Sequence, residues 1–141
     1  HNSAPKIVDA LNQIGISHEL VTTFPNNLSL YSSIFVCLGV YSNNHVLTAP
    51  QGSLLAAYLN GGGRLYMEGG DTWYYNSPTA VHPMFGILGQ GDGSGDLSTV
   101  VGMAGTFTEG MSFPYNGDNN WIDRIAPVSY THLTLPTIYS V

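Results

Sequence analysis

The chain has 141 residues, enough for one domain, and 43% of them are hydrophobic, so it can bury a core. Only 9% are charged, the net charge is −6, and Lys6, Arg64 and Arg124 are its three lysine and arginine residues, which argues against a nucleic-acid-binding surface. No apolar run approaches the ~20 residues of a membrane span, and the single Cys37 excludes a disulfide framework or a thiolate metal cluster.

The first thirty residues are predicted to form a helix, a strand and a helical turn. Asn2 or Ser3 can cap a helix that has Pro5 in its first turn and ends at Gly15. Its apolar stripe consists of Ile7, Leu11 and Ile14. Residues 16–22 alternate well enough for a strand, and a turn of helix is expected near residues 28–31.

Residues 34–71 are predicted to form a strand–helix–strand unit, around which the rest of the chain is organised. Residues 34–38 form an apolar run of strand length. Thr48 and Gln51 make a capping box at the start of a helix, which the glycines of residues 61–63 end. Residues 64–68 are the second strand. Such a unit predicts two parallel strands joined by a right-handed crossover.

The chain becomes rich in glycine and aromatic residues after Asp71. We expect an aromatic loop at residues 73–76, a short helix at 79–85, an irregular loop at 86–95, and strands at 98–103, 106–113 and 121–125. The predicted fold class is therefore α/β. It would be a partial doubly wound, mainly parallel sheet with flanking helices, whose first strand is missing.

The segment YLNGGGRLYMEGGD, residues 58–71, resembles the class I glutamine amidotransferase-like superfamily, which has a flavodoxin-like fold. It is most similar to the non-enzymatic members found in large secreted or surface bacterial proteins. The similarity covers roughly residues 5–85. It implies an incomplete domain over residues 1–127, whose first strand would lie upstream of His1. It also implies an extracellular or cell-surface location and contacts with other domains of the same polypeptide.

Active members of that superfamily carry a Gly-x-Cys-x-Gly turn after the strand that corresponds to residues 64–68. The matching turn here, residues 67–71, has neither Cys nor Ser, and a downstream His-x-Glu pair is absent. Cys37 falls inside the preceding strand, where a small buried apolar residue is the ordinary interpretation. The sequence therefore predicts a non-catalytic accessory or interaction domain, with no catalytic residues.

Polar and aromatic residues gather where the second strand of the unit ends, and α/β sheets bind ligands at this edge. The candidate ligand-binding residues are Glu68, Asp71, Trp73, Tyr74 and His82. They would bind a small polar or sugar ligand through carboxylates and stacking rings. Alternatively, the two carboxylates cap backbone amides and the aromatic rings cover the sheet end. A second function class is a hydrolase or transferase that uses Glu68, Asp71 and His82 as acid–base groups.

Two segments, residues 92–96 and 116–120, resemble calcium loops because oxygen-bearing side chains alternate in them. Neither has the glycine at position six or the acidic residue at position twelve of an EF-hand loop. Turn chemistry explains both, since Asp, Asn and Gly favour turns. The sequence therefore predicts no metal and no cofactor.

The last residues, 128–141, resemble a translated sequencing adaptor. A transposase-type adaptor read in one frame encodes VSYTHLTLPT, residues 128–137, in order. The alternative is a genuine terminal strand, which the Leu-Thr-Leu alternation at residues 133–135 would support. We expect the natural sequence to stop near Ala126 or Pro127, and we assign no function to Tyr130 or His132.

Overall fold

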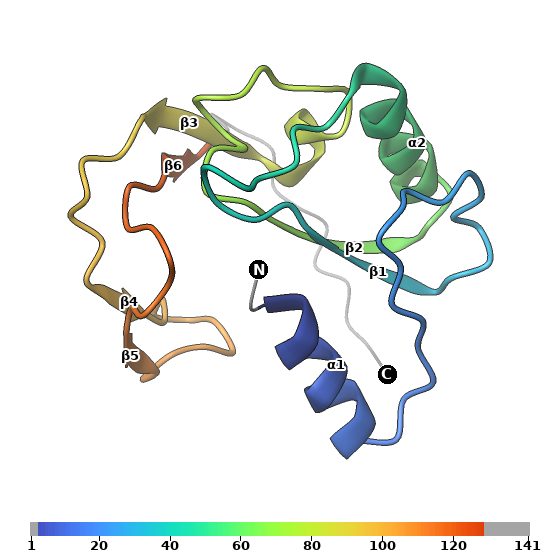
Figure 1. Cartoon of the computed structure of the whole chain (residues 1–141), viewed down its shortest axis with the longest axis horizontal. Helices are drawn as coiled ribbons and strands as arrows, with labels where there is room; N and C mark the ends of the chain where they lie inside the picture. The colour runs from blue at the N-terminus through green and yellow to red at the C-terminus, as the bar shows by residue number, and fades with distance from the viewer. Residues whose placement is uncertain (1–2, 129–141) are drawn as a thin grey trace.

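A computed structural model describes residues 3–128, and Figure 1 shows the arrangement of their helices and strands. Two α-helices, α1 (Ser3–Gln13) and α2 (Ala49–Asn60), and one 3₁₀-helix, η1 (His82–Phe85), are formed within this range. The strands are β1 (Ser33–Cys37), β2 (Arg64–Glu68), β3 (Ile87–Gly91), β4 (Thr99–Val101), β5 (Ser112–Pro114) and β6 (Arg124–Pro127). Residues 129–141, nearly all of the predicted adaptor-derived tail, lie outside the described residues.

The predicted strand–helix–strand unit is confirmed. β1 and β2 are parallel, in a register that pairs Ser33 with Arg64 and Cys37 with Glu68. Helix α2 connects them and begins with the expected capping box: the Thr48 amide donates to Gln51 Oε1 at 2.9 Å, and the Gln51 amide donates to Thr48 Oγ1 at 3.4 Å. After α2, Gly62 adopts φ 89°, a conformation that glycine reaches without steric cost and that turns the chain into β2.

The core lies between α2 and the β1–β2 pair. Leu55 on α2 is fully buried, and Met67 of β2 and Val81 pack in the same cluster. The Tyr58 hydroxyl donates to the Tyr31 carbonyl at 3.0 Å, which joins the end of α2 to the segment that enters β1. Of the predicted apolar face of α2, Leu55 and Tyr58 are buried, while Leu54 and Leu59 are half-buried at its margin.

The predicted fold class is wrong beyond this unit. The described residues form three separate two-stranded sheets, β1–β2, β3–β6 and β4–β5, instead of one doubly wound parallel sheet. A parallel strand needs a long crossover connection, usually a helix. Beyond α2, the described part of the chain contains one helix, the four-residue η1, so its later strands pair antiparallel.

Residues 16–22 also do not form the predicted strand. Leu20 is 59% exposed, and the His18 ring bonds locally to the Ile16 carbonyl at 2.9 Å. A strand requires a neighbour that satisfies its backbone groups, and the described structure places none beside this segment.

The glycine-rich segment contains a strand that the sequence did not predict. We expected residues 86–95 to be an irregular loop, but β3 pairs with β6 across Gly89. A Cβ at Gly89 would lie 2.2 Å from the Trp73 carbonyl oxygen, so glycine here permits close packing of two backbones.

The other expected strands are shorter or displaced. Strand β4 falls within residues 98–103, β5 overlaps only the end of 106–113, and β6 starts near the end of 121–125.

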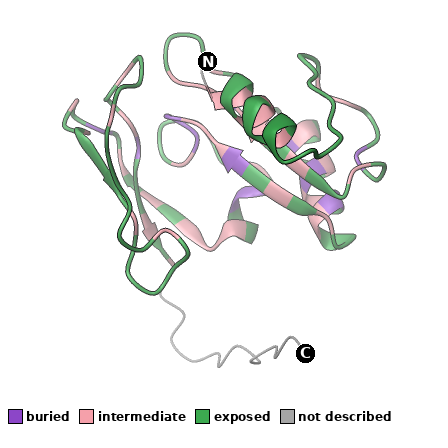
Figure 2. Ribbon diagram, turned by 90° about the horizontal axis from the view of Figure 1, so that it is seen from below, coloured by how far each residue is buried: buried purple, intermediate pink, exposed green. Residues whose placement is uncertain are grey.

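Helix α1 forms as predicted but packs loosely. It lies on the side of the β1–β2 pair opposite α2 (Figure 1). No residue of it is buried, and its ribbon in Figure 2 is green and pink, for exposed and intermediate residues. Ile7 and Leu11 are half-buried, whereas Ile14 is 70% exposed. Among residues 3–128, neither α-helix has the length and apolar character needed to cross a membrane.

Candidate functional site

Three carboxylates from distant parts of the sequence meet beyond the carboxyl ends of β1 and β2. Asp71 follows β2, Asp92 follows β3, and Asp123 precedes β6. One carboxylate oxygen of each lies within 4.8 Å of the others. Asp71 and Asp123 are buried, at 6% and 8% exposed, whereas Asp92 is exposed. We call these three residues the acidic site.

Backbone hydrogen bonds and a glycine hold together the segments that follow β1 and β2 and the segment that precedes β6. The Gly70 amide donates to the Gly39 carbonyl at 2.9 Å, and the Asp123 amide donates to the Gly70 carbonyl at 2.8 Å. The exit of β2 thus lies between the exit of β1 and the approach to β6. Side chains of Val40 and Ile122 would stand 3.0 Å from a Cβ at Gly70. Glycine at this position therefore lets the three segments approach one another closely.

Asp123 orders the aromatic loop that follows Asp71. Its Oδ2 accepts the amides of Trp73 at 2.9 Å and Tyr74 at 2.7 Å, and both carboxylate oxygens lie 3.3 Å from the Tyr75 amide. A carboxylate that accepts several backbone amides fixes a turn strongly, because charge-assisted bonds are stronger than neutral ones. The capping role that the sequence suggested for Glu68 and Asp71 is therefore performed here by Asp123.

Asp71 is the most poorly satisfied polar group of the site. Its Oδ2 is buried and has no hydrogen-bond partner among the described residues. Burial raises the pKa of Asp71, and the negative charges of Asp123 and Asp92 raise it further. A hydrogen bond from the Tyr41 backbone partly offsets this. A buried carboxylate in this state favours the approach of a hydrogen-bond donor or a cation.

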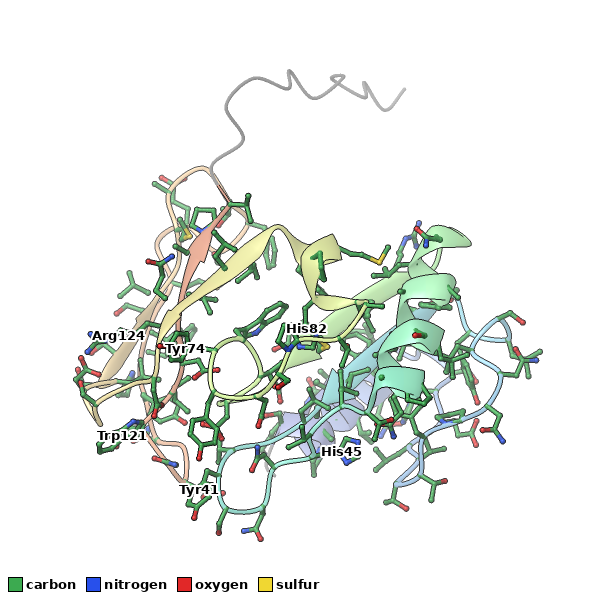
Figure 3. The ribbon with its side chains drawn as sticks, turned by 90° about the horizontal axis from the view of Figure 1, so that it is seen from above. Tyr41, His45, Tyr74, His82, Trp121 and Arg124 are labelled. Atoms are coloured by element: carbon green, nitrogen blue, oxygen red, sulfur yellow. The ribbon has the colours of Figure 1, made fainter. Side chains whose placement is uncertain are left out.

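Three exposed aromatic residues belong to the backbone segments that form the acidic site. Tyr41 is 66% exposed, Tyr74 54% and Trp121 51%. The backbone of each lies at or near the site. The Tyr41 backbone forms a hydrogen bond to Asp71, the Tyr74 amide donates to Asp123, and Trp121 lies two residues before Asp123. The Asn119 side chain also donates to the Tyr41 carbonyl at 3.4 Å and accepts from the Trp121 amide at 2.9 Å. Figure 3 shows the three aromatic residues on the side of the molecule away from α2.

The structure separates the residues that the sequence grouped as ligand-binding candidates. Asp71 and Tyr74 lie at the acidic site. Glu68 accepts a hydrogen bond from the Tyr66 hydroxyl at 2.8 Å instead. The Trp73 ring packs edge-on against His82, with ring centroids 5.3 Å apart, and so belongs with the core.

His82 is buried and held by its neighbours. Its Nδ1 accepts the Thr79 amide at 2.8 Å, and burial lowers the pKa of its imidazole despite backbone hydrogen bonds that raise it. Within residues 3–128, Asp71, Asp92 and Asp123 are the one set of three acidic, His or Cys groups whose ligand atoms lie within 4.8 Å of one another. Glu68, Asp71 and His82 therefore do not converge as an acid–base trio.

Cys37 does not have the properties of a nucleophile. It is half-buried at the end of β1, and its thiol pKa is raised to about 11, by burial first and then by the charge of Glu68. A nucleophilic cysteine needs a lowered pKa. The turn after β2 presents glycines at positions 69 and 70, where an active relative of the resembled superfamily would carry its nucleophile.

Sequence reasoning missed Asp92 and Asp123 as site residues. Asp92 belongs to a segment that resembles a calcium loop but that turn chemistry also explains, and Asp123 belongs to a predicted strand. No local pattern connects residues 71, 92 and 123, because β3–β6 pairing and the hydrogen bond from the Asp123 amide to the Gly70 carbonyl bring them together. The alternation of oxygen-bearing side chains at 92–96 was the one available signal.

A comparison of this chain with models of protein families, with curated proteins and with solved structures finds no match. The resemblance to the class I glutamine amidotransferase-like superfamily therefore remains a prediction from residues 58–71, and the case for a function depends on the geometry of the acidic site.

Proposed function

We propose that this chain is a non-catalytic accessory domain that binds a small polar ligand, of the sugar class, at the acidic site. One observation carries the proposal. A buried carboxylate oxygen of Asp71 lacks a donor, and three exposed aromatic residues belong to the backbone segments that form the site. Unsatisfied buried polar atoms are uncommon in native proteins and invite an explanation such as a missing ligand.

Sugar chemistry suits both parts of this site. Hydroxyl groups donate hydrogen bonds to carboxylates, and the apolar face of a sugar ring packs against an aromatic ring. The exposed rings of Tyr74 and Trp121 are available for such packing. Three carboxylates also disfavour anionic ligands such as phosphate, since like charges repel.

The arrangement of side chains supports binding over catalysis. Glu68 and His82 are engaged with Tyr66 and Thr79, away from Asp71, so the hydrolase or transferase alternative lacks a convergent acid and base. The resemblance adds the proposed setting, which is a secreted or surface bacterial protein whose other domains are the partners of this one. This setting is an inference from sequence.

A glycan array followed by calorimetry on the array's best ligand tests the proposal. Trp121→Ala and Tyr74→Ala should each weaken binding by roughly threefold to tenfold, since an aromatic contact is worth ~0.5–1.5 kcal/mol. Both residues are exposed, so the fold should tolerate the changes. Phe107→Ala is the matched control, because that ring is 93% exposed and lies outside the acidic site.

Substitution of single carboxylates gives a second test of the proposal. Asp71→Asn should weaken sugar binding, while Glu68→Gln should leave it unchanged, because Glu68 bonds to Tyr66 instead of lining the acidic site. The proposal fails if no glycan binds, or if Trp121→Ala, Tyr74→Ala and Asp71→Asn all bind like the parent protein.

A further inference from the structure

We propose that Asp71, Asp92 and Asp123 bind a single calcium ion. This inference rests on the site assigned in the proposed function, and it names a ligand that the acidic site would hold beside the sugar. It starts from two independent observations: the convergence of three carboxylates, and the orphaned oxygen of one of them.

The orphaned oxygen indicates more than a chance cluster of acidic residues. Asp71 is 6% exposed, its carboxylate lies within 4.8 Å of the other two, and its Oδ2 has no partner among the described residues. Exposed acidic groups are satisfied by water, whereas a buried carboxylate needs a donor or a cation. The unpaired Oδ2 of Asp71 therefore indicates a ligand that is not part of the protein chain.

The chain supplies no cation of its own to this site within residues 3–128. The ion pairs there are Lys6 with Asp9, at 3.8 Å, and Arg124 with Asp96, at 2.6 Å. Arg124 immediately follows Asp123, yet its guanidinium is directed to Asp96 and to Ser94 Oγ at 2.9 Å. The carboxylates of the acidic site thus face one another without a compensating positive side chain.

The chemistry of the donors favours calcium over other cations. All three are carboxylates, without His or Cys, which suits hard cations instead of zinc. Magnesium demands near-ideal octahedral geometry and is usually held by one or two carboxylates, whereas calcium accepts a flexible shell of six to eight oxygen ligands. Three carboxylates whose oxygens lie within 4.8 Å of one another therefore suit calcium better than magnesium.

The three ligands differ in what else they do. Asp123 Oδ2 is occupied by the amides of Trp73 and Tyr74, so its Oδ1, which has a single 3.3 Å contact from Tyr75, is the freer oxygen for a cation. Asp92 is exposed and leaves a side open to water and to a sugar hydroxyl. Calcium usually takes six to eight oxygen ligands, so waters or a ligand would complete its shell. We expect a dissociation constant of ~0.1–1 mM, the range of extracellular modules.

Calorimetry with calcium chloride on the whole chain, without sugar, tests the inference directly. Terbium luminescence excited through tryptophan gives a second readout, because Trp73 and Trp121 are near the site in sequence and structure. Asp92→Asn should weaken calcium binding by at least about tenfold, since ligand charge tunes affinity in such sites. Asp71→Asn should abolish it.

Asp118→Asn is the matched control, because Asp118 is exposed and outside the acidic site, and the substitution removes the same charge. It should leave calcium affinity unchanged. Since Asp92 is exposed, Asp92→Asn should fold like the parent protein. The midpoint of thermal unfolding of the two proteins, compared in EDTA, checks this. The inference is overturned if 10 mM calcium gives neither heat nor terbium displacement, if magnesium binds as tightly as calcium, or if Asp92→Asn and Asp118→Asn bind calcium equally.

A final experiment distinguishes the calcium proposal from the proposed sugar binding. Sugar binding is measured in calcium and in EDTA. Sugar binding that persists in EDTA, together with no calcium binding, overturns the cation site and leaves the proposed function standing. Calcium binding without any sugar binding supports the cation site and contradicts the proposed function.

Discussion

Replacing Asp123 tests how the acidic site is held together. Its carboxylate accepts amides from residues 48 to 50 positions earlier in the chain, so it joins the aromatic loop to the segment before β6. Asp123→Ala removes all of these acceptors. Asp123→Asn removes the charge but keeps one oxygen, and the two shortest bonds, from Trp73 and Tyr74, go to the same oxygen, Oδ2.

The two variants should therefore differ in stability. Hydrogen bonds to a charged acceptor contribute ~1.5–3 kcal/mol each, and the lower end applies because this loop is partly exposed. Two good bonds then give a loss of about 3–4 kcal/mol for Asp123→Ala. An asparagine oriented with its oxygen at the Oδ2 position still accepts hydrogen bonds from both amides. We therefore expect Asp123→Asn to lower the free energy of unfolding by about 1 kcal/mol. Both variants lose the same negative charge, so the difference isolates the hydrogen bonds.

Urea unfolding in EDTA, followed by tryptophan fluorescence, measures the difference. The slope of free energy against urea should be the same for both variants, so that the midpoints report stability alone. The reasoning is refuted if Asp123→Ala unfolds within about 0.5 kcal/mol of Asp123→Asn, since surface substitutions differ by no more than that. Such a result would mean that water satisfies the three amides as well as Asp123 does.

Three other predictions concern the core, the thiol and the buried histidine. Leu55→Ala should destabilise the protein by ~2–5 kcal/mol in urea unfolding, because Leu55 is fully buried, whereas Leu30→Ala, at a position 78% exposed, should cost less than about 0.5 kcal/mol. Cys37, whose thiol pKa is raised to about 11, should react with iodoacetamide at pH 8 roughly a hundredfold or more slowly than a free thiol of pKa ~8.5, and fast alkylation would contradict the raised pKa. Burial lowers the pKa of His82, so the unfolded chain binds its proton more readily and stability should fall as the pH drops below about 6.5. His82→Asn, which keeps an acceptor for Thr79, should reduce the difference in unfolding free energy between pH 7 and pH 5, and an unchanged difference would show that other groups cause it.

The strand–helix–strand unit was predictable because its signals are local. The Thr48–Gln51 capping box, the stop after Asn60 and two short apolar strands each act within a few residues, and all three appear in the structure. The apolar stripe of α2 also located the core, since Leu55 and Tyr58 are buried. Local propensity and tertiary packing agree in this part of the chain.

The fold class failed because it extended this unit by analogy to the rest of the chain. After α2 the sequence offers glycine-rich turns in place of long helices, so its strands pair antiparallel in two further small sheets. The position of β3 depends on Gly89 packing against the Trp73 backbone, a long-range contact that residues 86–95 do not reveal by themselves. The acidic site was missed for the same reason, because long-range contacts form it: the β3–β6 pairing and the hydrogen bond between the Asp123 amide and the Gly70 carbonyl.

Gly93 offers a last test of how close backbone packing builds the acidic site. A Cβ at this buried residue would lie 2.4 Å from the Ile122 carbonyl oxygen and 2.6 Å from the Ile122 nitrogen. Both are backbone atoms, so Gly93→Ala must push residue 92 away from residue 123. Gly91→Ala is the matched control, since nothing lies within 4 Å of a Cβ there.

We expect Gly93→Ala to cost ~1–3 kcal/mol, as overpacked positions do. It should also weaken the proposed calcium binding at least as much as Asp92→Asn, although it removes no ligand atom. Gly91→Ala should change neither property appreciably. If Gly93→Ala binds calcium like the parent protein while Asp92→Asn does not, then the position of Asp92 is set by its side chain and the loop around it. Contact between the Gly93 and Ile122 backbones would then have no part in forming the site.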